Sequence, residues 1–174
     1  MVKHYYKEMR SPVGRLKLIS NTKNLVAVLW QGCEPKWVDK RERKEGETHP
    51  VLKKTQTQLN EYFAGKRITF DIPLESYGTV FQKKVWKTLR KIPYGKKWSY
   101  LDIAQKIGSE KACRAVGGAI GKNPISIIVP CHRVIGKNGT LTGFAGGLKA
   151  KKFLLELERG GGEPKKLRLT PSFF

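Results

Sequence analysis

The chain has 174 residues, of which 39% are hydrophobic and 28% charged, enough for one ordinary domain or two small ones with a real core. Its 35 Lys and Arg residues against 14 Asp and Glu residues give a formal net charge of +21, which indicates a polyanionic partner. No apolar run approaches the roughly 20 residues that span a bilayer, and the N-terminus has no apolar signal segment. We therefore expect an intracellular, cytoplasmic protein without membrane association.

The positive charge is concentrated in the second half of the chain. Residues 80–174 hold 20 basic and five acidic side chains, whereas residues 1–79 hold 15 and nine. Charge alone does not separate a nucleic-acid-binding protein from a merely basic soluble one. Its uneven distribution favours a nucleic-acid face in the second half.

The sulfur and imidazole side chains are few and scattered, at Cys33, Cys113, Cys131, His4, His49 and His132. An odd number of distant cysteines is a poor disulfide framework. The spacing also does not match that of zinc ligands. Reduced thiols and no metal are expected.

Residues 1–76 predict a small antiparallel sheet with one helix. A hairpin is expected over residues 5–30, with its turn at SPVG and a buried strand at LVAVLW. The charged residues 34–48 predict a loop, and Thr48 is expected to cap a helix that ends at Gly65. The segment ITFDIPL predicts one more strand. No catalytic constellation is visible, so the role of this part is expected to be structural.

Residues 77–160 predict a mainly helical domain. Thr79 with Gln82 forms a capping-box pattern, and Ser99 is expected to cap a second helix that Gly108 closes. A third helix is expected from about Glu110 to Ile120. Two short helices around a glycine turn in a basic segment are typical of a helix-turn-helix, a pattern that other helical proteins share.

The third predicted helix, KACRAVGGAIG, is unusually rich in small residues. Each interior glycine costs about 1 kcal/mol relative to alanine. The small residues fit close packing against the following strand, or close approach of the helix to nucleic acid with Arg114 as its only long central side chain.

The segment from Ile125 to Ile135, ISIIVPCHRVI, is the centre of the sequence. Its β-branched start predicts a buried strand that Pro130 ends, which places Cys131 on a turn. The cationic neighbours His132 and Arg133 would favour the nucleophilic thiolate. The alternative is a buried structural cysteine.

The rest of the chain predicts a glycine-rich loop, a helix and a tail. Residues 142–147 lack the Lys-Ser/Thr ending of a phosphate-binding loop, and a lid over a cleft suits them better. The helix LKAKKFLLELE should bury Phe153, Leu154 and Leu157. Residues 161–174 are expected to form a basic, flexible C-terminal tail.

Taken together, these motifs resemble the O6-alkylguanine-DNA alkyltransferases. The similarity is carried by IIVPCHRVIG, RAVGGAIGKNP, SYLDIA and GFAGGLKAKKFLLELE, and extends over about residues 5–160. It implies an RNase H-like α/β domain at residues 1–76 and a winged helix-turn-helix domain at residues 77–160. Some family members carry a structural zinc, but its Cys and His set does not appear here.

The resemblance also implies roles for individual residues. Cys131 matches the alkyl acceptor, and His132 with Glu158 matches the pair that takes the thiol proton through a water. Tyr100 matches the phenol that touches the flipped base and its phosphate. Asn123 matches the residue that ties the recognition helix to the active-site strand.

Two further groups of residues are expected to contact the substrate. The residues expected to bind DNA are Tyr100, Ser109, Lys111, Lys137 and Arg114, of which Arg114 replaces the extruded nucleotide in the base stack. The residues expected to wall the pocket are Val134, Phe144, Ala145 and Gly146.

The implied function is repair of duplex DNA by single-turnover transfer of an alkyl group from O6-alkylguanine, mainly O6-methylguanine, to Cys131. O4-methylthymine is a second candidate substrate, and a monomer without cofactor is expected. Two alternatives remain: a helix-turn-helix transcription regulator and a Cys–His hydrolase.

Overall fold

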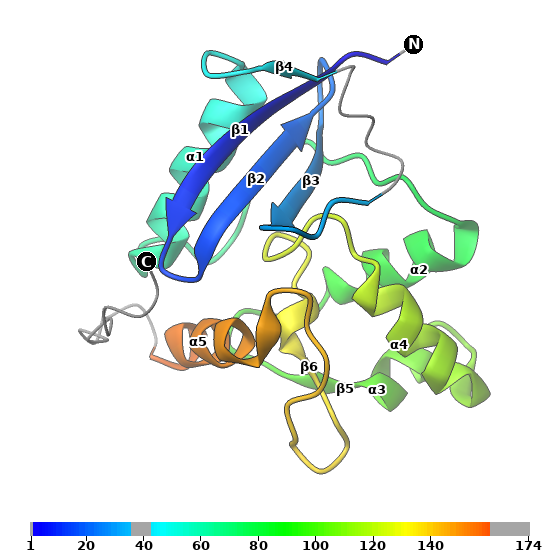
Figure 1. The fold of residues 1–174 in the computed structure, drawn as a ribbon. Helices are drawn as coiled ribbons and strands as arrows, with labels where there is room; N and C mark the ends of the chain where they lie inside the picture. The colour runs from blue at the N-terminus through cyan, green and yellow to red at the C-terminus, as the bar shows by residue number, and fades with distance from the viewer. Residues whose placement is uncertain (1, 36–42, 161–174) are drawn as a thin grey trace.

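A four-stranded sheet and one helix make up the first half of the chain in the computed structural model, which describes residues 2–35 and 43–160. The elements of this half are β1 (His4–Ser11), β2 (Gly14–Ser20), β3 (Leu25–Trp30), β4 (Arg43–Glu45) and α1 (Pro50–Phe63). The sheet order is β3-β2-β1-β4, and the first three strands are antiparallel. Helix α1 packs against one face of this sheet (Figure 1). The predicted hairpin, buried strand and helix are confirmed.

Three details of this half differ from the prediction. Helix α1 begins at Pro50 with His49, not Thr48, at the N-cap position and without a side-chain cap. Proline is preorganised for the first helical position, so it sets the start. Strand β4, parallel to β1, lies within residues 34–48, where only a loop was expected. Its sequence, RKE, has no alternation of apolar and polar residues that would mark a strand.

The predicted strand ITFDIPL is also wrong. This segment makes one isolated bridge, between Leu74 and Leu25 of β3. Instead, the side-chain amide of Gln58 on α1 donates to the carbonyl oxygen of Asp71 and accepts from its N–H, at 3.2 and 2.9 Å. The segment is thus tied to a helix, and Pro73 has no N–H with which to extend a ladder.

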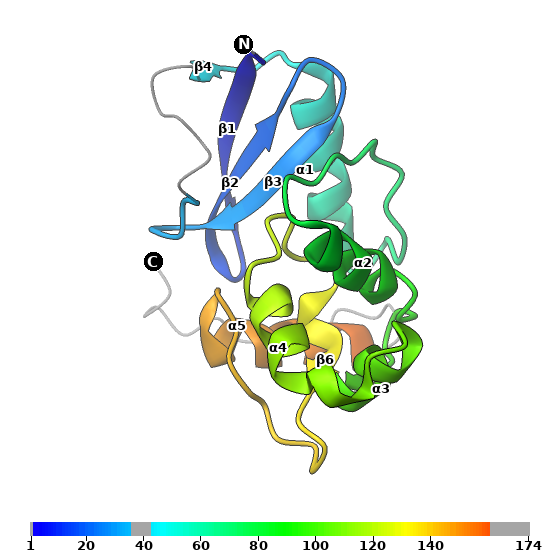
Figure 2. The same ribbon diagram turned by 90° about the vertical axis from the view of Figure 1, so that its right-hand side faces the viewer.

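The second half is mainly helical, as expected. Its elements are α2 (Val80–Leu89), β5 (Trp98–Ser99), α3 (Tyr100–Lys106), η2 (Glu110–Ala112), α4 (Cys113–Gly121), η3 (Cys131–Arg133), β6 (Val134–Ile135) and α5 (Gly147–Arg159). Strands β5 and β6 form a two-stranded parallel sheet. Figure 2 shows these helices gathered at one end of the first-half sheet. No helix in the described parts of the chain is long and apolar enough to cross a membrane.

Helix starts in this half follow the sequence signals closely. Thr79 forms a capping box with Gln82, and Ser99 forms one with Asp102. The predicted third helix differs in its first turn, which is the 3-10 helix η2, and Ser109 provides no side-chain cap. On α5, Leu154 is buried, whereas Phe153 and Leu157 are only half-buried.

One hydrophobic core runs through both halves. The indole N–H of Trp30 on β3 donates to the hydroxyl of Ser126 at 3.1 Å. The backbone of Val28 bonds to Pro124 and Ser126, with N–O distances of 2.9 and 3.2 Å. The segment that leads to Cys131 is therefore attached to the sheet of the first half.

Candidate active site

A buried turn delivers Cys131, where the sequence predicted a strand. Residues 125–129 make only isolated bridges, and Ile127 has a φ of 72°, an uncommon conformation for a β-branched residue. The side chain of Asn123 closes the turn, accepting from the N–H of Ile125 at 3.0 Å and donating to the carbonyl oxygen of Val129 at 2.9 Å. The Asn123 side chain, just after α4, therefore holds the two ends of the turn together.

Cys131 opens η3 and is 6% exposed. Burial raises the pKa of its thiol, although the Asn123 amide, the Lys151 charge and nearby backbone N–H groups partly oppose that rise. The expectation that adjacent cations favour the thiolate is therefore wrong, because the effect of burial on the thiol pKa is larger than the opposing effects. Arg133 does not serve the sulfur, because its guanidinium bonds Glu158. A neutral thiol needs a base to become nucleophilic.

His132 and Glu158 form the predicted pair. The imidazole Nε2 lies 2.7 Å from Glu158 Oε1, and both side chains are buried. Burial raises the pKa of Glu158, but the hydrogen bonds from His132 and Arg133 and the charge of Arg133 outweigh this effect and hold that pKa at about 2. An ionised carboxylate can only accept, so Nε2 carries the proton and Nδ1 keeps its lone pair.

His132 is a neutral imidazole in this site. Burial lowers its pKa, and the Glu158 carboxylate offsets only part of that effect. Among the described residues, none offers its Nδ1 a hydrogen bond. The geometry thus presents one basic nitrogen on the ring, with the other nitrogen fixed.

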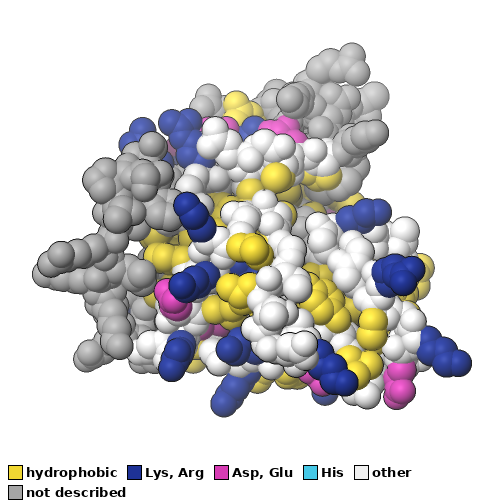
Figure 3. All heavy atoms as spheres, turned by 60° about the horizontal axis from the view of Figure 1, so that its bottom comes forward, with side chains coloured by type: hydrophobic (Ala, Val, Ile, Leu, Met, Phe, Trp, Pro, Cys, Tyr) yellow, Lys and Arg dark blue, Asp and Glu magenta, His cyan; other side chains and the backbone are white. Residues whose placement is uncertain are grey.

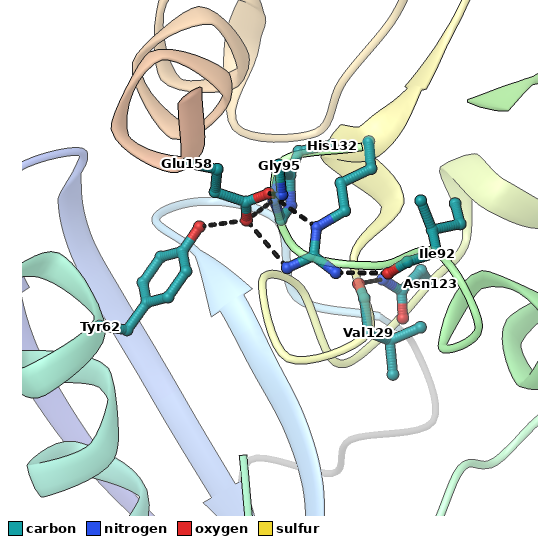
Figure 4. Close-up of polar contacts among 8 residues, drawn as sticks. Tyr62, Ile92, Gly95, Asn123, Val129, His132 and Glu158 are labelled. Atoms are coloured by element: carbon teal, nitrogen blue, oxygen red, sulfur yellow. Dashed lines mark hydrogen bonds and ion pairs between the residues drawn. The ribbon is translucent and has the colours of Figure 1, made fainter. Parts of the chain in front are cut away.

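The Glu158 carboxylate has more partners than the sequence indicated (Figure 4). Arg133 donates through Nε at 2.8 Å and Nη2 at 3.0 Å, and its Nη1 donates to the Ile92 carbonyl at 2.6 Å. The Gly95 N–H donates at 3.1 Å and the Tyr62 hydroxyl at 2.7 Å. Sequence reasoning noticed Arg133 only as a cation beside the thiol, and nothing in the sequence connects position 62 with position 158.

Lys151 is a second buried cation that sequence reasoning missed. Its side chain is 1% exposed, and its ammonium donates to the carbonyl oxygens of Val134 and Thr142 at 2.5 and 3.0 Å. Burial lowers its pKa, while the nearby Cys131 raises it. A lysine on the buried face of an amphipathic helix was the available signal.

The predicted pocket residues lie in strand β6 and in the loop before α5. Val134 is buried in β6. The ring of Phe144 packs edge-on against Trp30 at 5.3 Å between centroids, and a Cβ on Gly146 would come within 2.6 Å of the same indole. The loop is therefore seated on the first-half sheet at this end. Tyr100 reaches the other end, with its hydroxyl 2.8 Å from that of Thr142.

The predicted DNA contacts lie on the outside of the second half. Lys111 and Arg114 are exposed and border one shallow concavity with Ala112, Cys113 and Ala115. Ser109 is half-buried just before η2, and Lys137 is exposed in the turn after β6. On the face at the bottom of Figure 1, Lys and Arg outnumber Asp and Glu and surround patches of hydrophobic surface (Figure 3). Such a surface suits a polyanion.

No group of three or more potential ligand side chains that could hold a metal ion occurs within residues 2–35 and 43–160.

Glu158 should make the protein sensitive to acid. Its pKa of about 2 lies below the ordinary 4.5, so the unfolded chain takes up this proton first as the pH falls. The stabilisation is present above about pH 5 and is lost as the pH falls towards 2, by about 3 kcal/mol. Denaturant unfolding across this range should show a steeper loss for the wild type than for Glu158→Gln. Parallel pH dependences would contradict it.

The two halves of the chain match two family models. Residues 1–76 match the model described as 6-O-methylguanine DNA methyltransferase, ribonuclease-like domain. Residues 80–160 match the model described as 6-O-methylguanine DNA methyltransferase, DNA binding domain. The predicted fold class, an RNase H-like α/β domain followed by a mainly helical DNA-binding domain, agrees with both.

Curated relatives give the same result along most of the chain. A methylated-DNA–protein-cysteine methyltransferase from Haemophilus influenzae is 46% identical over 160 residues, covering 89% of this chain and 86% of that protein. The constitutive enzyme of that name from Bacillus subtilis is 48% identical over 160 residues, covering 90% and 96%.

Solved structures agree as well. The crystal structure of Mycobacterium tuberculosis O6-methylguanine methyltransferase has a TM-score of 0.82 and 42% identity, covering 95% of this chain and 98% of that one. The structure of the M. tuberculosis protein OGT in complex with DNA has the same score and identity, covering 92% and 96%. The resemblance inferred from the motifs around Cys131 is confirmed: the chain belongs to the 6-O-methylguanine DNA methyltransferase family.

Proposed function

We propose that this protein repairs duplex DNA by moving the alkyl group of O6-alkylguanine, mainly the methyl group of O6-methylguanine, onto its own Cys131. One observation carries the proposal: a buried thiol is followed by a neutral imidazole whose Nε2 is held by an ionised carboxylate. The methylated-DNA–protein-cysteine methyltransferases that are 46–48% identical support it.

The transfer is a displacement at carbon. His132 Nδ1 takes the thiol proton through a water, and Glu158 stabilises the imidazolium that forms. The sulfur of Cys131 then attacks the alkyl carbon; the S–C bond forms, the C–O6 bond breaks, and the electron pair stays on the purine. The Tyr100 hydroxyl donates a hydrogen bond as negative charge develops there. The purine anion then takes up the proton that His132 removed, so the thiol hydrogen ends on a restored guanine that remains in the DNA strand, and the alkyl group ends on sulfur.

The residues around Cys131 supply the means to generate the thiolate transiently. The Lys151 ammonium and the Asn123 amide both favour the anion, as the direction of their effects on the thiol pKa indicates. Asn123 also holds the turn that precedes the cysteine. It therefore connects the end of α4, which meets DNA in this proposal, with the reacting sulfur.

The target atom is inside a duplex, so the base must be rotated out. Unstacking costs a few kcal/mol. Arg114, exposed on α4, offsets part of this by filling the gap in the stack. The small residues beside it let the helix approach a groove wall, and Ser109, Lys111 and Lys137 hold the phosphates. Val134 and residues 144–146 wall the pocket.

The product is a thioether at Cys131, which has no leaving path. The protein is thus consumed after one transfer and needs neither cofactor nor metal. All the groups used lie in one chain, which supports action as a monomer on alkylated duplex DNA, in the cytoplasm at the nucleoid or in a nucleus. Two domains, residues 1–76 and 77–160, are part of this proposal, and the predicted tail at 161–174 lies outside the described residues.

The test uses a duplex oligonucleotide containing one O6-methylguanine and a mass measurement of the intact protein. One methyl group per chain, located on Cys131 by peptide mapping and absent in Cys131→Ala, is expected. No gain, or a gain that persists in Cys131→Ala, would overturn the proposal. Tight binding to one DNA sequence without methyl gain would favour a transcription regulator, and repeated turnover on an ester or amide would favour a hydrolase.

A further inference from the structure

A side chain from the first half of the chain hydrogen-bonds to the reactive network. Tyr62 on α1 is 0% exposed, and its hydroxyl donates to Glu158 Oε1 at 2.7 Å. That same oxygen accepts the His132 Nε2 proton at 2.7 Å. Two single hydrogen bonds therefore join α1 to the imidazole, across 96 residues of sequence between Tyr62 and Glu158.

The direction of the Tyr62 hydrogen bond is fixed. Glu158 is ionised and can only accept, so the phenol must donate. Burial and the adjacent carboxylate also raise the pKa of Tyr62, which keeps its proton in place. Tyr62 is thus a permanent donor to the carboxylate.

The ring of Tyr62 is held independently of its hydroxyl. It packs against Phe63, Phe70 and Tyr94, with centroid distances of 5.5, 5.5 and 6.2 Å. Loss of the hydroxyl alone should leave the ring where it is. The substitution Tyr62→Phe should therefore remove one hydrogen-bond donor from Glu158 and leave the packing of the ring unchanged.

Titratable and charged side chains around the Glu158 carboxylate come from both halves of the chain. The titratable and charged groups are Tyr62 from α1, Tyr94 from the loop after α2, Cys131, His132 and Arg133 from η3, and Lys151 and Glu158 from α5. Arg133 and the Gly95 N–H take up Oε2, and Arg133 also reaches Oε1. Tyr62 is the donor among these that the first half contributes.

We propose that Tyr62 is a positioning residue for alkyl transfer. Through its hydroxyl, the first half of the chain orients the Glu158 carboxylate and limits how strongly this carboxylate stabilises the protonated form of His132. This inference rests on the proposed function. It assigns residues 1–76 a part in the chemistry, where sequence reasoning gave them only a structural role.

The proposal has a defined pH consequence. Without the Tyr62 hydroxyl, the carboxylate keeps more of its charge and stabilises imidazolium more strongly, so the pKa of His132 rises. The base must be neutral to take the thiol proton. The acidic limb of the transfer rate should therefore move to higher pH in Tyr62→Phe, and looser orientation should lower the plateau rate about 3- to 10-fold.

The experiment is a quenched-flow measurement of methyl transfer from an O6-methylguanine duplex, with wild type or Tyr62→Phe in excess over a range of pH. A second reaction uses DNA in excess. Because each chain reacts once, the final fraction of methylated protein in that reaction measures how much of the protein is folded and reactive, whereas the rate with protein in excess measures the transfer step. The expected result is an undiminished final fraction, a slower plateau and an acidic limb at higher pH.

Tyr94→Phe is the matched control. Its hydroxyl is buried in the same cluster, but it has no hydrogen-bond partner among the described residues. Its pH profile should equal that of the wild type. A Tyr62→Phe profile identical to wild type, or a reduced final fraction at an unchanged rate, would overturn the positioning role. Failure of the wild type itself to gain a methyl group would instead overturn the proposed function.

Discussion

Glu158→Gln should slow methyl transfer by about 10²- to 10⁴-fold and lower the free energy of unfolding by about 3–5 kcal/mol. The carboxylate accepts from Tyr62, His132, Arg133 and the Gly95 N–H, and both oxygens are used. An amide has one acceptor atom, so its NH₂ group must face other donors. Either His132 loses the partner that fixes its tautomer, or the buried Arg133 loses half of its counter-ion.

Glu156→Gln is the matched control for this substitution. Glu156 lies on the same helix and is exposed, and its carboxylate makes a long surface contact of 3.9 Å with Lys152. Surface pairs of this kind contribute little, so both rate and stability should stay close to wild type. The measurements are the single-turnover rate on methylated duplex and denaturant unfolding at pH 7. A Glu158→Gln protein that reacts at the wild-type rate would contradict the role of the carboxylate.

The parts of the fold that local chemistry specifies could be predicted. The alternation of Leu16 and Leu18 marks β2, and the capping pairs Thr79–Gln82 and Ser99–Asp102 mark helix starts that the structure reproduces. Each of these signals lies within a few residues of the feature it determines. The tight correspondence follows from that short range.

The segment around Cys131 shows where local reasoning ends. Five apolar or small residues with β-branching predict a strand, yet residues 125–129 form a turn with Ile127 at positive φ. Two sets of contacts from outside the segment override propensity: the nearby Asn123 amide closes the turn, and Val28 and Trp30 of the distant β3 bind Pro124 and Ser126. Neither can be seen in the segment itself.

The sequence predicted five catalytic residues, and the structure places further side chains around them. Cys131, His132 and Glu158 follow from the family motif, and the structure places the last two in direct contact. Tyr62 lies on α1, 96 residues before Glu158, so no spacing rule selects it. Lys151 lies on α5 with Glu158, and its place on the buried face of that helix was the signal that was missed. The state of the thiol was also misjudged, because adjacency in sequence suggested that Arg133 faces the sulfur, whereas the chain turns its guanidinium to Glu158.

The second large expected effect concerns Arg114, on the surface proposed to bind DNA. Arg114→Ala should slow methyl transfer from an O6-methylguanine duplex by about 10- to 100-fold, since the unstacked state loses part of the few kcal/mol that the side chain restores. Arg114 is exposed on α4, so its loss should change the free energy of unfolding by less than about 0.5 kcal/mol. Reaction with free O6-methylguanine, which needs no extrusion, should keep its wild-type rate.

Arg114→Lys separates stacking from charge. Lysine keeps the positive charge but lacks the planar guanidinium that can lie against bases. If Arg114 acts by filling the stack, Arg114→Lys should bind duplex with the wild-type salt dependence and still transfer slowly. If it acts only on phosphates, Arg114→Lys should recover the wild-type rate, and Arg114→Ala should lose affinity with a shallower salt slope. Equal losses on duplex and on free base would place the defect at Cys131 instead, and would refute a role for Arg114 in extruding the base.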